Sequence, residues 1–349
     1  MKHFVKKIIY SLGYLLYHSG LFKVIIKLTR YRKKILNYHE ISDDNNPFID
    51  GLNIKIPIAA FISQMKFLKQ YYNIVSIDTM IGHIENNKKT DREVALTFDD
   101  GYKSFINNAF SILKQFNYPA TVFIVGKCLN DDYYMWRNKL CFLLNSDFTI
   151  TTKCMQNYFD HLQVSYKNMF GQFGKNEIIK KSAEIARFMK PPQIEELLSD
   201  IVTSIEIPKN ELYLNIRDCN ILSKEGIEFG NHSYTHFEFN YLNEKEVDCE
   251  TRSWPPDMTN GINYKHSWLA LPRGNPIERN EILGIVKSNG IKCIFCSNGL
   301  DNDENTSLYN LGRQHLMSSK EYEIFTEMEL LPLFRNIKNM CLRALFFSN

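Results

Sequence analysis

Short apolar, β-branched runs that each end in polar residues recur along this 349-residue chain, and they constrain its fold more than any other feature. Amphipathic helical patterns lie between several of them, for example at 61–72 and 104–116. Near-continuous apolar strands that alternate with such helices are typical of a mainly parallel sheet with both faces covered. The pattern therefore predicts an α/β fold whose sheet is open or closed into a barrel. The runs are 33–40, 73–80, 93–100, 120–126, 226–233, 267–274 and 291–299.

The alternation is interrupted once, by a polar and helical stretch at about 130–212. Because strand-like runs resume after it, we interpret this stretch as a helical insertion in one large domain. The predicted organisation is a basic amphipathic helix at 1–32, the α/β domain at 33–320, and closing helices at 321–349. A break is expected near Pro332.

The N-terminal arm is strongly basic, since residues 1–39 hold nine Lys and Arg and no acid. The remaining chain has 33 basic and 39 acidic residues, which gives no electrostatic reason to expect a nucleic acid partner. The arm lacks the cleavage site of a signal peptide, and His18 and Lys23 interrupt its apolar run. Two interpretations stay open: a helix lying on an anionic membrane surface, or one packed on the domain with a solvated basic face.

Eight cysteines are scattered without the spacing of a disulfide scaffold. The close pair in CIFC, 293–296, lies in an apolar run, so we expect two buried core thiols rather than a redox or zinc site. A cytoplasmic location, with peripheral contact to the inner membrane face through residues 1–32, is the resulting expectation.

Polar side chains follow several predicted strands at the point where each strand ends. His39 and Glu40 follow the first run, Asp99 and Asp100 end the third, and His232 ends the fifth. Because the carboxyl ends of parallel strands meet at one edge of the sheet, these side chains are expected at a common mouth.

The adjacent carboxylates Asp99 and Asp100 repel each other at the end of a buried strand, and a cation is the expected compensation. His232 and His236 lie four residues apart, close enough on a helical turn to share a metal ion. Two imidazoles and one carboxylate leave a position for water, as in catalytic divalent sites. Zinc is the first expectation, with cobalt, nickel or iron as alternatives. The competing interpretation is an Asp-Asp-Gly turn in which Asp100 caps the next helix.

TFDDG at 97–101, together with H-x-x-x-H at 232–236, resembles the polysaccharide deacetylases of carbohydrate esterase family 4. The resemblance covers roughly residues 33–315. It implies Asp99 as general base, with Asp100, His232 and His236 as metal ligands. It also implies an irregular (β/α) barrel of seven or eight strands.

A third family motif, an oxyanion loop, corresponds to LALPRG at 269–274. Pro272 matches the motif, but Arg273 stands where the family has an aromatic residue, and Ala270 stands where many members have an arginine partner for the base. If the backbone N–H at 273 does the work, the side chain is free to vary. The Arg273 guanidinium is then available for the oxyanion, for an anionic substrate group or for an aspartate.

The leaving amine requires an acid, and two histidines are candidates. Many family members use a late histidine, which corresponds to His315 in LGRQHL. NYHEI at 37–41 resembles the Tyr-His motif of the poly-N-acetylglucosamine deacetylase subgroup, in which the acid histidine precedes TFDDG. We favour His39 and retain His315 as the alternative.

The predicted function is a metal-dependent hydrolase that removes N-acetyl groups from an N-acetylhexosamine-containing glycan or lipid-linked saccharide, by attack of a metal-bound water. The partner is accordingly an acetylated amino-sugar glycan or glycolipid. Two alternatives remain: an inactive glycan- or glycolipid-binding protein on the same fold, and a deformylase of a lipid-linked amino sugar.

Overall fold

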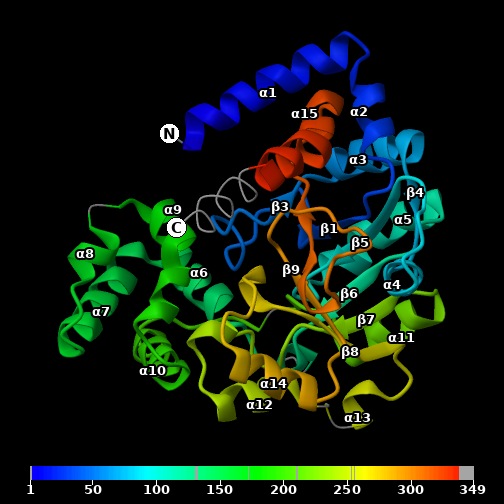
Figure 1. Cartoon of the computed structure of the whole chain (residues 1–349). Helices are drawn as coiled ribbons and strands as arrows, with labels where there is room; N and C mark the ends of the chain where they lie inside the picture. Colours follow the sequence, from blue (N-terminus) through cyan, green and yellow to red (C-terminus); the bar gives the residue numbers. More distant parts are fainter. Residues whose placement is uncertain are drawn as a thin grey trace, which may run out of the picture.

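The computed structural model describes residues 2–129, 133–171, 173–209, 211–252, 254 and 256–337 (Figure 1). Its main sheet has eight strands in the order β10-β9-β8-β7-β6-β5-β1-β11, with β4 added beside β5. All pairs of strands in this sheet are parallel. The end strands β10 and β11 are separated in the chain by Arg313 alone. The sheet is therefore nearly closed, and the predicted α/β barrel of seven or eight strands is confirmed.

The strands are β1 (Lys34–Tyr38), β2 (Glu40–Ile41), β3 (Lys55–Ile56), β4 (Asn73–Ile74), β5 (Glu93–Phe98), β6 (Thr121–Ile124), β7 (Glu228–Asn231), β8 (Tyr264–Ala270), β9 (Cys293–Cys296), β10 (Leu311–Gly312) and β11 (Gln314–His315). The strand predicted at 73–80 is wrong beyond Ile74, because Ser76 caps a helix that begins at Ile77. β9 is the CIFC segment, and both of its thiols are buried as expected.

The α-helices are α1 (Lys2–His18), α2 (Phe22–Leu28), α3 (Ile58–Tyr71), α4 (Ile77–Glu85), α5 (Phe110–Phe116), α6 (Trp136–Ser146), α7 (Phe148–His161), α8 (Tyr166–Phe170), α9 (Lys175–Lys181), α10 (Pro191–Val202), α11 (Ile216–Lys224), α12 (Glu244–Thr251), α13 (Pro256–Thr259), α14 (Asn280–Ser288) and α15 (Glu321–Phe325). The π-helical turns η1 (Phe105–Ala109) and η7 (Thr326–Leu330) continue into α5 and out of α15, and η5 (Pro272–Gly274) is a short 3₁₀ turn.

The alternation of side chains along β5 aims the first catalytic motif into the barrel. Val94, Leu96 and Phe98 pack in one apolar cluster with side chains of α3. Ala95 points the other way, into a cluster with Phe123 and with Phe295 of β9. Because side chains alternate along a strand, Thr97 and Asp99 lie on this inner side as well.

Helices α6 to α10 lie between β6 and β7 in the chain and form a group beside the barrel (Figure 1). They pack on the loop between β2 and β3 through side chain to backbone hydrogen bonds. Asn138 Nδ2 donates to the carbonyl of Phe48 at 3.0 Å, and Asn145 Nδ2 donates to that of Asp50 at 3.0 Å. The predicted boundary at 130–212 stays a prediction, as do those at 32 and 320.

The first helix lies across the C-terminal helices (Figure 1). A Cβ on Gly13 would stand 1.8 Å from Thr326 Oγ1, so only glycine allows this close approach. The break predicted at Pro332 is wrong, since the helix continues to residue 337. The π turn at 326–330 directly precedes this proline, and such turns are a common site of irregular helix hydrogen bonding. Residues 338–349 of the predicted closing helices lie outside the described residues.

Gly230→Ala should destabilise the barrel. A Cβ at Gly230 would stand 2.4 Å from the Phe123 ring, so the ring must move within a packed interior. Overpacking of this kind typically costs about 1–3 kcal/mol, which should lower the urea midpoint of unfolding. Gly284→Ala in α14 is the control, because nothing lies within 4 Å of its new Cβ. An unchanged midpoint for Gly230→Ala would contradict the packing described.

Candidate active site

A cavity of about 420 Å³ opens at the carboxyl ends of the barrel strands. It collects side chains that follow β1, β5 and β7, as predicted for a parallel sheet, and adds residues from the loops around them. Seven of the eight predicted site residues line it: His39, Asp99, Asp100, His232, His236, Arg273 and His315. The eighth, Pro272, is buried beside Arg273 in η5.

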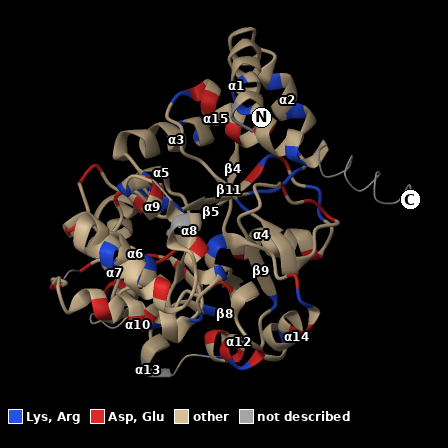
Figure 2. Cartoon of the chain, turned by 90° about the vertical axis from the view of Figure 1, so that its left-hand side faces the viewer, with Lys and Arg blue, Asp and Glu red and all other residues tan. Residues whose placement is uncertain are grey.

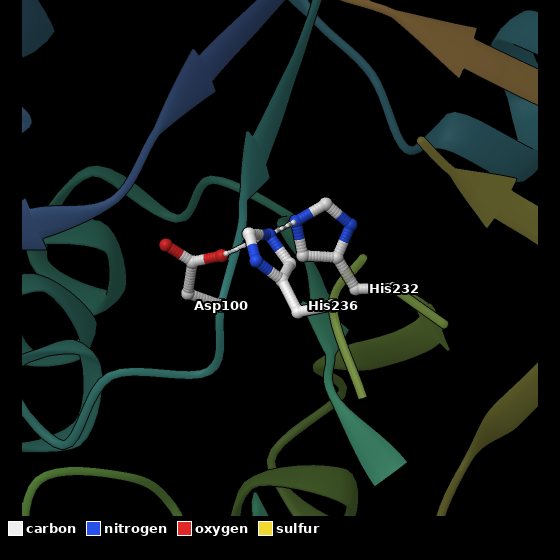
Figure 3. Close-up of side chains that lie close together, drawn as sticks. All are labelled: Asp100, His232 and His236. Atoms are coloured by element: carbon white, nitrogen blue, oxygen red, sulfur yellow. Dashed lines mark hydrogen bonds and ion pairs between the residues drawn. The ribbon is translucent and has the colours of Figure 1, made fainter. Parts of the chain in front are cut away.

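Asp100, His232 and His236 point toward one another (Figure 3). Asp100 Oδ1 lies 3.2 Å from Nε2 of each histidine, and the two Nε2 atoms are 3.2 Å apart. For metal bonds of about 2.0–2.1 Å, tetrahedral geometry separates neighbouring ligand atoms by about 3.3–3.4 Å. The three atoms thus form a triangle of the size that a small divalent cation requires.

The position of the proton on the His232 ring also favours a metal site. Its Nδ1 lies 2.8 Å from the carbonyl oxygen of Ala270, so Nδ1–H donates and Nε2 carries the lone pair. Asp100 Oδ1 is buried and has no hydrogen-bond donor among the described residues. A lone pair of His232 therefore faces a buried carboxylate oxygen, and this is stable only with a cation or a proton between them. The residues fit a divalent metal.

Strained backbone turns hold these ligands in place. Asp100 has φ of 70° and His236 has φ of 69°, and residues other than glycine rarely adopt such values. Gly101 continues the first turn at φ of 65°, and a Cβ there would stand 2.9 Å from Ile124. The second turn is held by Ser233 Oγ, which accepts a hydrogen bond from the backbone N–H of His236 at 3.0 Å. The rings are thus positioned before any ligand binds.

Asp99 lies beside the triangle and is paired with Arg313, a residue that sequence reasoning missed. Arg313 Nη1 and Nη2 donate to the two carboxylate oxygens at 2.6 and 2.7 Å, and Asn37 Nδ2 donates at 2.9 Å. Burial alone would raise the pKa of Asp99, but Arg313, helped by His232, holds it at about 2. Asp99 is therefore ionised at neutral pH. Arg313 thus gives Asp99 the arginine partner that Ala270, at the position of the arginine in many family members, cannot provide.

His39 and His315 stack on each other at the rim, with ring centroids 5.4 Å apart and an interplanar angle of 15°. Burial lowers the pKa of His39, and the negative charges of Asp100 and Asp99 oppose this effect. The pKa of His315 is also lowered, mainly by burial and then by the positive charges of His39 and Arg313. Its side chain nevertheless reaches solvent. The structure places both candidates at the cavity and leaves the choice between them a prediction.

The third motif forms a tight turn at the same edge. Arg273 has φ of 67°, and Gly274 follows with φ of 70°. A Cβ on Gly274 would stand 2.3 Å from that of Ser297, so the turn requires glycine there. The Arg273 side chain is about one third exposed, and its Nε lies 3.9 Å from Glu238 Oε2. The predicted pairing of Arg273 with an aspartate is not seen among the described residues.

Arg313→Met should strongly destabilise the protein, because it leaves the buried Asp99 carboxylate without its counter-ion. Removing one partner of a buried pair typically costs about 3–5 kcal/mol, measurable by urea unfolding. Arg313→Met combined with Asp99→Asn should recover part of this loss, since a neutral amide requires no cation. Equal stability of the single and double variants would contradict the coupling.

Comparisons with known proteins point to one family. Residues 86–162 match the family model described as polysaccharide deacetylase. A Staphylococcus epidermidis poly-beta-1,6-N-acetyl-D-glucosamine N-deacetylase is 31% identical over 112 residues, 28% of this chain and 39% of the relative. YxkH of Bacillus subtilis, named for the same family, is 25% identical over 133 residues, 38% of this chain and 44% of the relative. The chain thus matches less than half the length of either relative.

Two solved structures have a similar fold. The Streptococcus pyogenes deacetylase PplD aligns with a TM-score of 0.56 at 16% identity, over 86% of this chain and 99% of its own. IcaB from Ammonifex degensii aligns with a TM-score of 0.53 at 12% identity, over 85% and 97%. At these identities the alignments establish the fold. Together with the match at 86–162, they confirm the resemblance of this chain to the polysaccharide deacetylases.

Proposed function

We propose that the protein is a metal-dependent hydrolase that removes N-acetyl groups from an N-acetylhexosamine in a glycan or a lipid-linked saccharide. The observation that carries the proposal is an ionised carboxylate, Asp99, beside the triangle of ligand atoms formed by Asp100, His232 and His236. His232 Nε2 lies 3.9 Å from Asp99 Oδ2 and 3.2 Å from Asp100 Oδ1. The two neighbouring carboxylates therefore serve different partners within one cavity.

Asp100, His232 and His236 would hold the cation. Two imidazoles and one carboxylate suit zinc, and cobalt, nickel or iron accept the same donors. When bound there, a divalent cation would supply Lewis-acid chemistry, by polarising a carbonyl and lowering the pKa of water. The rest of the reaction falls to groups that belong to the chain.

Asp99 acts as the general base. Its carboxylate is ionised at neutral pH and lies at the edge of the triangle, where it accepts a proton from the attacking water. Arg313 and Asn37 fix the orientation of the carboxylate, and Arg313 keeps it charged. The bidentate pair also makes Asp99 a weak base, which suits a water that is already acidified.

His39 acts as the acid that protonates the departing amine. The negative charges of Asp100 and Asp99 oppose the lowering of the His39 pKa by burial, whereas the lowering of the His315 pKa is opposed by Asp99 and increased by His39. Arg313 lowers both pKa values. The stacked His315 ring holds His39 at the rim of the cavity. The backbone N–H of Arg273, in the turn at φ of 67°, is the proposed donor to the oxyanion.

Asp99→Asn and His232→Ala separate catalysis from metal binding. With zinc added, the wild type should release acetate from acetylated glucosamine oligomers, and a chelator should abolish this. Asp99→Asn should keep the metal and lose about 10²–10⁴-fold in kcat, because the base is gone. His232→Ala should lose both metal and activity.

Asp78→Asn, on the exposed face of α4, is the matched control and should behave as wild type. Metal content is measured by mass spectrometry and acetate by an enzyme-coupled assay. N-formyl and N-acetyl oligomers are compared in parallel, since the same attack serves both groups. Normal turnover by Asp99→Asn, or wild-type turnover in chelator, would refute the mechanism.

We also propose that the protein works at the inner, anionic face of a membrane, to which α1 and α2 bind peripherally. α1 packs one side, including Ile9 and Gly13, on the C-terminal helices. On its opposite side Phe4, Ile8 and Leu15 are 68%, 53% and 64% exposed. Lys6 and Lys7 lie in the same helix, and Lys23 and Lys27 lie in α2, so both helices carry basic residues (Figure 2). Exposed apolar side chains among cations suit the interface of an anionic bilayer.

The described helices limit the mode of contact. None of them alone is long and apolar enough to cross a bilayer. Phe4–His18 and Phe22–Leu28 meet the length and composition only as a pair, and they bend by 102° between them. Peripheral binding requires no such span.

Leu15→Glu should abolish sedimentation with vesicles that contain 30% phosphatidylglycerol, because it places a charge in the exposed apolar stripe that would enter the bilayer. The wild type should sediment with these vesicles, and less so in high salt or with neutral lipid. Ile221→Glu, at an exposed apolar side chain of α11, is the control and should sediment like wild type. The proposal would be rejected if Leu15→Glu sedimented with the vesicles as wild type does. It would also be rejected if light scattering without lipid showed that the wild type forms a dimer through this stripe.

A further inference from the structure

The cavity contains positive charges that the proposed hydrolysis does not use. Arg137 at the start of α6, Lys180 of α9 and Arg273 of the third motif all line it. Two of the three come from the helical group between β6 and β7, which is outside the barrel strands. The metal ligands and the base are complete without them.

Arg137 has little compensation within the protein. Its Nε donates to Ser182 Oγ at 3.5 Å, and no carboxylate of the described residues lies within 4.0 Å of its guanidinium. Burial and, next, the positive charge of Arg273 lower the pKa of Arg137 to about 10, against a smaller opposing effect of Asp100. Arg137 is still charged at neutral pH, and Arg273 affects its pKa more than any acid does.

Arg273 has one long ion pair, and Lys180 has none with the described residues. The nearest carboxylate to Arg273 is that of Glu238, at 3.9 Å, and Glu238 Oε1 already accepts a hydrogen bond from Asn275 at 2.7 Å. Lys180 makes no ion pair or hydrogen bond with any residue that the structure describes. Cations held together in a partly desolvated cavity are costly unless an anion joins them.

The acids of the cavity do not supply that anion. Asp99 is bound by Arg313 and Asn37, and Asp100 faces the two histidines. A second hollow, of about 950 Å³, shares Asn53 and Lys180 with the cavity and adds Lys175 from the same helix. Lys181 also lines this hollow, as do the acids Asp50 and Glu177, so its lining has one more positive than negative side chain.

We propose that Arg137, Arg273 and Lys180 bind an oxyanion, a phosphate or a carboxylate, that the substrate carries beside the acetylated sugar. A guanidinium presents paired N–H donors that match the oxygens of either group, and two guanidiniums with an ammonium suit a charged substituent. The inference rests on the proposed function, and it narrows the substrate class from neutral acetylated glycans to anionic ones.

Binding of three small sugars to the full-length, zinc-loaded protein tests the proposal. The probes are N-acetylglucosamine, which is neutral, N-acetylglucosamine 1-phosphate and N-acetylmuramic acid, which carries a carboxylate. At least one anionic sugar should bind 10-fold or more tightly than the neutral one, as expected for charge-assisted hydrogen bonds. The preference should shrink in high salt. Which of the two binds better distinguishes phosphate from carboxylate.

Arg137→Gln should reduce this preference about 10-fold or more, and Lys180→Gln should reduce it by a smaller factor. Arg217→Gln, at an exposed arginine of α11 that does not line the cavity, removes the same charge and should leave the preference intact. Lys180 is exposed, so its variant keeps the test valid if Arg137→Gln fails to fold. If the oxyanion binds only the metal, neither variant should change the preference for anionic sugars, and that result would overturn the proposal. Equal binding of all three sugars would also overturn it.

Turnover separates this inference from the function on which it rests. Hydrolysis of neutral and anionic substrates with equal kcat/KM would reject the oxyanion site and leave the deacetylase proposal standing. Tight binding of anionic sugars that depends on Arg137, without hydrolysis of any acetylated substrate, would reject the deacetylase and support the oxyanion site.

Discussion

The buried ion pair between Asp99 and Arg313 connects the closure of the barrel to the chemistry at its edge. The two residues are 214 positions apart in the chain. Arg313 is the single residue between β10 and β11, the two ends of the sheet, and its side chain is fully buried. β11 pairs with β1, which pairs with β5, and Asp99 directly follows the last residue of β5. The register that closes the barrel is therefore the same register that brings a guanidinium to the carboxylate. An open sheet would leave Asp99 buried beside Asp100 without a counter-ion.

That pair also explains how two adjacent aspartates acquire different tasks. Asp99 points inward with the side chains of β5 and is held by Arg313 and Asn37. The positive φ of Asp100 turns the next side chain toward the histidines. Two carboxylates of equal intrinsic acidity thus occupy different environments, one beside the guanidinium of Arg313 and one in a potential metal site. The repulsion that the sequence presents as a problem is resolved by giving each carboxylate its own positive partner.

Much of the fold and the ligand set is predictable from sequence because the signals are local. Strand runs, the Asp-Asp-Gly turn and two histidines at a spacing of four each occupy a few consecutive residues. Arg313 has no such signal: it lies two residues before His315, and only the closed sheet shows that it reaches β5. The strand predicted at 73–80 fails for a local reason, since the cap at Ser76 outweighs the apolar run that follows. The helix continues through Pro332 because the preceding π turn accommodates a missing donor. Arg137 was missed because nothing in its neighbourhood indicates that α6 docks on the loop near Phe48.

The parts of the molecule that can set specificity differ from those that hold the ligands. Asp99, Asp100, His232 and His236 are fixed by buried strand ends, strained turns and a buried arginine, so a substitution near them disturbs the barrel itself. Arg137 and Lys180 come from helices that pack on the domain through an apolar cluster, which includes Phe48 and Leu269, and through hydrogen bonds such as Asn138 to Phe48. Neither Arg137 nor Lys180 lies on a strand of the barrel. Under the proposed function, the helical group is therefore the part of this fold in which we expect a change of charge to alter substrate choice.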